Sequence, residues 1–223
     1  MRLMNEEYFD EQVLRRLDDV AIQNTARFQT NSAIARLPET TWLERRLKQV
    51  AVRAPYGVNL IDKERPYLLR VYLRPERPEV GGRRPYLHYF YRGDDDRAWH
   101  NHPWGDEAGE DVSTSLILTG GYVEERLVFD PHWDWRGPAS AWIDYRVETK
   151  TFKPWSINRI ARNDFHKVRL LDERRGCWTL FWSARRAAPS DGYDWGFKDI
   201  KSNYEPWGEH HRRKYGVWPK VKG

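Results

Sequence analysis

The chain has 223 residues and a formal net charge of +5, with a single cysteine and twelve tryptophans. This length suits one domain with a small appendage, and it allows a core to form without cross-links. Cys177 has no partner for an internal disulfide, and no segment approaches the ~20 apolar residues that a membrane-spanning helix needs. The first residues are acidic where a secretory signal would be apolar. We therefore expect a cytoplasmic protein that does not cross a membrane.

Helices are predicted in residues 1–60, as an N-terminal extension. Asn5 can cap a first helix over residues 6–27, which carries apolar residues on one face. A second helix begins with a capping box formed by Thr41 and Glu44. Its apolar stripe consists of Leu43, Leu47 and Val50. Both stripes need cover, so we expect these helices to pack on the outside of the following domain.

The hydrophobic pattern changes to a period of two from about residue 66. Candidate strands are 67–73, 86–92, 97–102, 113–119, 122–129, 141–147, 157–161, 165–171 and 177–183. Many short strands that are separated by glycine-containing turns, with no helix between them, indicate an antiparallel sandwich or barrel. The predicted fold class is therefore mainly β, an antiparallel jelly-roll barrel over residues 61–200.

His100 and His102 are separated by one residue on a predicted strand. Side chains at i and i+2 point to the same face, so both imidazoles can bind one metal ion. Two histidines at this spacing alone are more often an ordinary pair of surface or core residues. His166, at the start of the predicted strand 165–171, offers a third ligand from a distant part of the chain. Three neutral imidazoles predict a site for one divalent cation.

Two carboxylates are candidates for further groups at this site. Glu107 follows the histidine pair closely, but residues 105–112 fit a loop insertion better, so we expect Glu107 to be solvated. Glu124 and Arg126 share one face of the predicted strand 122–129. If that face lines the interior, they are candidate catalytic residues near the metal; if it faces outward, they form a solvated pair.

The C-terminal segment 201–223 is basic and rich in aromatic residues. Residues 196–223 hold seven Lys/Arg and three Asp/Glu, whereas the rest of the chain is close to neutral. Interleaved aromatic and basic residues can bind single-stranded nucleic acid. Terminal segments also dock on their own domain with their charges solvated. We favour the docked tail and keep nucleic acid as the alternative partner.

Residues 66–197 resemble the cupin superfamily, and in particular small bacterial and phage cupin-like proteins with an HxHPW core. The matching segments are 86–92, 94–97, 100–104, 115–124, 166–168, 177–180 and 195–197. The resemblance implies the cupin barrel with His100, His102 and His166 as metal ligands. Because cupins commonly pair, it also implies a homodimer.

The reaction expected from this resemblance is open between several classes. The three-histidine site is similar to the irons of thiol dioxygenases and some other cupin oxygenases. The resemblance thus favours a non-haem Fe(II) dioxygenase acting on a small polar or anionic substrate, with Mn, Ni or Zn as alternative metals. A metal-dependent isomerase or lyase, or a non-catalytic protein that binds a small ligand, are the other classes.

Overall fold

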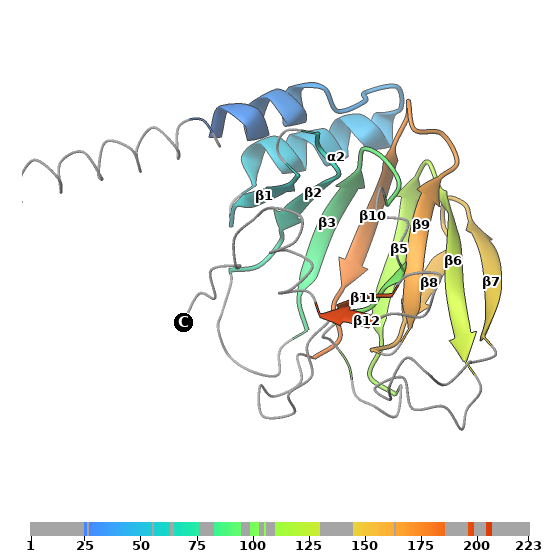
Figure 1. Ribbon diagram of the computed structural model, residues 1–223. Helices are drawn as coiled ribbons and strands as arrows, with labels where there is room; N and C mark the ends of the chain where they lie inside the picture. Colours follow the sequence, from blue (N-terminus) through green and yellow to red (C-terminus); the bar gives the residue numbers. More distant parts are fainter. Residues whose placement is uncertain are drawn as a thin grey trace, which may run out of the picture.

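Two antiparallel six-stranded sheets make up the body of the protein (Figure 1). The computed structural model describes residues 25, 27–54, 56–62, 65–75, 83–94, 99–102, 105, 110–129, 145–162, 164–185, 196–198 and 204–206. Sheet A contains, in spatial order, β1 (Val58–Ile61), β2 (Leu68–Tyr72), β3 (Pro85–Phe90), β10 (Cys177–Trp182), β5 (Ser113–Thr119) and β8 (Ile157–Ile160). Sheet B contains β12 (Tyr204–Pro206), β11 (Gly196–Lys198), β4 (Trp99–His100), β9 (Phe165–Leu170), β6 (Tyr122–Phe129) and β7 (Tyr145–Phe152).

The inner faces of the two sheets form a common core. Ile117 of sheet A is fully buried against Tyr122, Phe152 and Val168 of sheet B. In β5 buried and partly exposed residues alternate without a break, as expected for a strand with one face inside. The prediction of a mainly β fold, with antiparallel strands in two sheets that face each other, is confirmed.

The strands with a clear inward face are those that the sequence places best. β5 and β6 have the predicted limits. The strand predicted at 141–147 is β7, which begins at Tyr145 and whose residues 146–151 are exposed. Its position follows from pairing with β6 and not from an apolar pattern. The short strands β1, β11 and β12 were not predicted. They lie at or next to the edges of their sheets.

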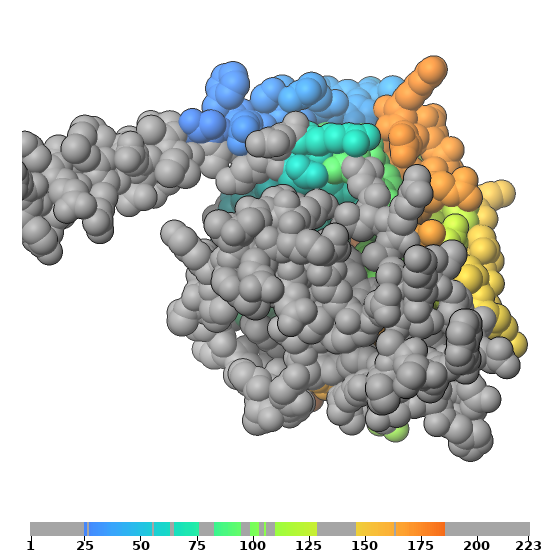
Figure 2. All heavy atoms as spheres, viewed as in Figure 1, coloured from blue at the N-terminus to red at the C-terminus, as the bar shows by residue number. Residues whose placement is uncertain are grey.

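Two helical segments cover the outer face of sheet A (Figure 1). They are residues 27–35 and α2 (Trp42–Arg53). The core between them and the sheet consists of Ala33, Ile34, Leu37, Ala51, Leu60, Leu69, Val71, Leu87, Tyr89 and Trp178. In Figure 2 the two helical segments, in blue, lie on the surface beside the orange turn that follows β9. Within the described residues, no helix has the length and apolar character needed to cross a membrane.

The N-terminal end of α2 shows the predicted capping box. The Thr41 side chain accepts from the Glu44 amide, and the Glu44 carboxylate accepts from the Thr41 amide. Arg175 also donates to Glu44, which is fully buried. These contacts turn Glu44 and Ala51 toward the sheet, so the predicted stripe is wrong at Val50, which is 39% exposed.

Several predicted segments lie mainly outside the described residues. The first predicted helix, 6–27, is described only at residues 25 and 27, which are helical, and the helix continues to residue 35. β1 begins at Val58, inside the segment expected to form the helical extension. Of the C-terminal segment 201–223 only β12 is described, and it pairs with β11.

Candidate metal centre

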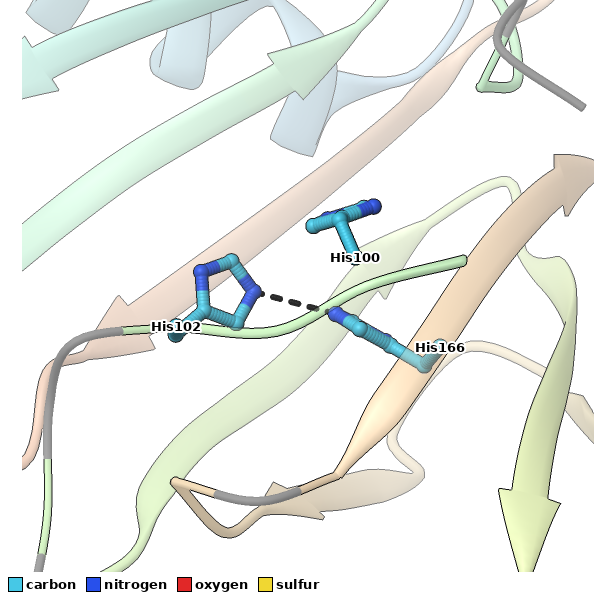
Figure 3. Close-up of side chains that lie close together, drawn as sticks. All are labelled: His100, His102 and His166. Carbon is cyan, nitrogen blue, oxygen red and sulfur yellow. Dashed lines mark hydrogen bonds between the residues drawn. The ribbon is translucent and has the colours of Figure 1, made fainter. Parts of the chain in front are cut away.

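Three histidines come together on the inner face of sheet B. His100 on β4 pairs directly with His166 on β9, and His102 follows two residues after His100. Their potential ligand atoms all lie within 4.8 Å of one another. Figure 3 shows the three imidazole rings gathered between β9 and the segment that contains β4. The three histidines predicted from the sequence therefore meet at one place.

His102 was predicted to lie on the same strand as His100, and the structure differs on this point. β4 contains only Trp99 and His100, so His102 lies beyond the strand. Asn101, between the two histidines, is fully buried, whereas His100 and His102 are partly exposed. Pro103, Trp104 and Glu107 lie outside the described residues. His100 thus faces the cluster from a strand, whereas His102 reaches the cluster from the segment that follows β4.

Glu124 lies behind His166 and is 2% exposed. Its Oε1 accepts hydrogen bonds from His166 Nδ1 at 2.6 Å and from Asn158 Nδ2 at 2.8 Å. Its Oε2 accepts from Arg126 Nη2 at 2.8 Å. Burial would raise the pKa of Glu124, but the hydrogen bond from His166, the charge of Arg126 and the hydrogen bond from Asn158 lower it below its ordinary value. Glu124 is therefore an ionised acceptor with both oxygens engaged.

The tautomer of His166 follows from this contact. Because an ionised carboxylate only accepts, Nδ1 of His166 must carry the proton, and in the neutral ring Nε2 carries the lone pair. That Nε2 lies 3.0 Å from Nε2 of His102. Two nitrogens that bind one ion at about 2.1 Å and at right angles are about 3.0 Å apart. The residues present therefore fit a divalent cation.

The protonation of His102 also suits a ligand. Removal of water from the ring lowers its pKa well below the ordinary value, and the nearby charge of Arg70 lowers it further. His102 is thus neutral at pH 7, as metal binding requires. A carboxylate also stands near the third ring: Asp94 Oδ2 lies 4.0 Å from His100 Nδ1. Asp94 is held by the amide of Val168 at 2.5 Å.

The positions of Glu124 and Arg126 answer a question that the sequence left open. Both lie on the inner face, where Arg126 pairs with His166 across β6 and β9 and also donates to Asp164 at 2.8 Å. Glu124 contacts the nitrogen of His166 that points away from His102, so it is placed to orient a ligand and not to be one. A catalytic role for Glu124 or Arg126 stays a prediction.

Asn158 and Asp94 were not assigned a role from the sequence. Asn158 lies on β8 of sheet A and reaches Glu124 and Tyr122 on sheet B, so its contact depends on how the sheets face each other. No local pattern around residue 158 signals such a contact. Asp94 precedes β4 by a few residues, and only its charge close to a histidine pair could have drawn attention to it.

Comparisons with known proteins found distant structural likenesses only. No family model matches the chain, and no curated protein matches it. One similar solved structure is Fe(II)-HppE with the alternative substrate (S)-1-HPP, with 9% identity over 57% of this chain and 55% of that chain and a TM-score of 0.37. KdgF from Halomonas sp. has 14% identity over 60% of this chain and 98% of that chain, with a TM-score of 0.33. The Drosophila melanogaster CENP-C cupin domain has 7% identity over 58% of this chain and 74% of that chain, with a TM-score of 0.35. The chain spans about half the length of HppE. These likenesses concern the fold alone, and no ligand, reaction or partner follows from them.

Proposed function

We propose that the protein is a metal-dependent oxidoreductase, a non-haem Fe(II) dioxygenase that acts on a small polar or anionic substrate. The observation that carries the proposal is the cluster of His100, His102 and His166, in which Glu124 fixes one tautomer. Three neutral ligands leave the 2+ charge of the ion uncompensated, which favours an anionic ligand. Bound Fe(II) would supply open coordination positions for a substrate and dioxygen, together with the redox chemistry.

The chain's own residues hold and orient this site. His100, His102 and His166 would provide the ligand nitrogens. Glu124 keeps the proton of His166 on Nδ1, and Asn158 ties Glu124 to the opposite sheet. Such contacts to a ligand histidine raise its basicity and fix its ring.

Metal content and oxygen consumption test the proposal. The full chain is purified without added metal, analysed for elements, loaded anaerobically with Fe(II), and then exposed to oxygen with sets of small carboxylates, amino acids, thiols and phosphonates. We expect one divalent ion per chain and oxygen uptake with at least one substrate set. The His166→Ala variant should lose both, while its melting curve shows that it remains folded.

Two other outcomes would contradict the proposed reaction. Substrate conversion without oxygen uptake would make the protein an isomerase or lyase that uses its metal as a Lewis acid. Tight binding of a small molecule without any conversion would make it a non-catalytic binding protein. Failure to bind any divalent ion would remove the basis of the proposal altogether.

A further inference from the structure

Sheet A presents a charged side chain, Arg70 on β2, to the barrel interior. The neighbours of Arg70 on the strand, Leu69 and Val71, are fully buried in the core under the helices. Since side chains alternate along a strand, Arg70 points to the opposite, inner side. It pairs there with His88 on β3. Arg70 is partly exposed, so an arginine stands inside the barrel in contact with water.

The guanidinium of Arg70 is held in place by the residues beside it. Its Nε donates to Nε2 of His88 at 3.0 Å, and its Cζ lies 5.1 Å from the ring centre of Tyr86. His88 is 4% exposed and stacks on Phe181, with ring centres 5.1 Å apart. Burial, and then the charge of Arg70, lower the pKa of His88 well below its ordinary value. His88 is therefore a neutral acceptor that fixes Arg70 without neutralising it.

The two terminal nitrogens of Arg70 remain available. Within the part of the chain that the structure describes, Arg70 has no carboxylate partner, and neither Nη1 nor Nη2 forms a hydrogen bond. Arg92 and Arg126, which are also partly withdrawn from water, pair with Asp62 and Glu124. A guanidinium without a counter-ion presents a planar fork of donors that suits a carboxylate or a phosphate.

Arg70 faces the same interior as the three histidines. Arg70 pairs with His88 on the inner face of sheet A, His100 pairs with His166 on the inner face of sheet B, and these two faces pack on a common core. Sheet A thus carries a fixed positive charge opposite the cluster on sheet B.

We propose that Arg70, oriented by His88, binds the oxyanion group of the substrate, while the other end of the substrate occupies the metal positions at His100, His102 and His166. This rests on the proposed metal-dependent function. It narrows the substrate class to small organic anions with two functional ends: a carboxylate, phosphate or phosphonate, and a hydroxyl, amine or thiol able to bind a metal.

A binding experiment tests this assignment without relying on turnover. The anaerobic Fe(II) protein is titrated calorimetrically with glycolate and with glycolamide, which has the same shape but no charge. The variants are Arg70→Gln, Arg70→Lys and the control Arg169→Gln, which removes an exposed arginine from β9. In Arg70→Gln we expect glycolate affinity to fall about tenfold or more, with metal content and glycolamide affinity unchanged. Arg70→Lys should lose less, and Arg169→Gln nothing.

The outcomes separate this inference from the proposed function. Unchanged glycolate affinity in Arg70→Gln, or equal losses for glycolate and glycolamide, would overturn the role of Arg70 in recognising charge. If Arg70→Gln does not fold, Arg70→Lys decides, because it keeps the charge and removes the fork. If the wild type binds no metal, the proposed function fails, but inorganic phosphate on the metal-free protein still tests Arg70. Phosphate binding that is lost in the Arg70 variants supports the assignment, and its absence in the wild type overturns it.

Discussion

Glu124, inside the barrel, and Glu44, at the N-terminal end of α2, are both buried carboxylates, 2% and 0% exposed. Burial opposes ionisation in each, yet hydrogen bonds lower the pKa of both below the ordinary value. The two groups differ in what lies beyond their partners. His166 carries a second nitrogen that faces the histidine cluster, whereas Glu44 bonds to the cap of α2 and to Arg175, which is 45% exposed.

The two buried, hydrogen-bonded carboxylates, Glu124 and Glu44, should therefore have different roles. A change at Glu124 reaches the ligand nitrogen through the imidazole ring. A change at Glu44 ends at the helix and at the turn that carries Arg175. Glu124 should therefore govern metal affinity, and Glu44 should govern stability.

The largest expected effect is the loss of metal binding when two of the three histidines beside Glu124 are removed. The double variant His100→Ala/His102→Ala should bind no stoichiometric metal by elemental analysis, since a single remaining imidazole cannot hold the ion. Glu44→Gln, the matched control, should keep the full metal content. Stoichiometric metal in the double variant would show that the site lies elsewhere.

The next effect concerns Glu124 itself. Glu124→Gln keeps the shape of the side chain but removes the charged acceptor for Nδ1 of His166. Metal affinity, measured by competition with a chelator, should fall about ten- to hundredfold. The control is Glu125→Gln, which removes the neighbouring carboxylate that pairs with Lys167 at 2.9 Å. Equal affinities in the two variants would contradict the positioning role of Glu124.

A smaller effect is expected at Glu44. Glu44→Gln weakens charge-assisted hydrogen bonds from Arg175 and from the cap of α2, so the free energy of unfolding should fall by about 2 kcal/mol. Urea denaturation measures this loss. Chelator competition on the same variant should give the wild-type metal affinity. A lowered metal affinity would mean that the two regions are coupled.

The smallest effect is the pH dependence of that loss. The pKa of Glu44 is lowered from 4.5 in the folded protein, so its stabilising contribution is present above pH 4.5 and is lost as the pH falls below that value. The difference in unfolding free energy between the wild type and Glu44→Gln should therefore shrink between pH 5 and about pH 3. A difference that stays constant over this range would show that the carboxylate charge contributes nothing.

The convergence of the histidines could be predicted because it depends on local spacing and on strand pairing. His100 and His102 lie two residues apart, and His166 opens a strand that was recognisable from its apolar pattern. The role of Glu124 could not be predicted, since the hairpin register is compatible with an inward or an outward face. Its partner Asn158 lies 34 residues away on the other sheet.

The same limit applies to Arg70. The sequence Leu68–Tyr72 predicts a strand, but the face that each residue takes depends on which layer covers it. Helices that pack on Leu69 and Val71 make that side the outside of the barrel. An arginine in an apolar strand then becomes an interior group. Sequence alternation gives the two faces but does not say which one is covered by the second sheet.

The pairing of β4 with β9 has a consequence for how the protein folds. His102 and His166 are 64 residues apart in sequence, and they approach only when sheet B has assembled. An unfolded chain therefore offers no preformed site, so a metal ion would bind the native state. By mass action a metal concentration of 100 times Kd adds about 2.7 kcal/mol of stability. That gain should slow unfolding and leave the refolding rate nearly unchanged, since contacts made late stabilise the native state more than the transition state.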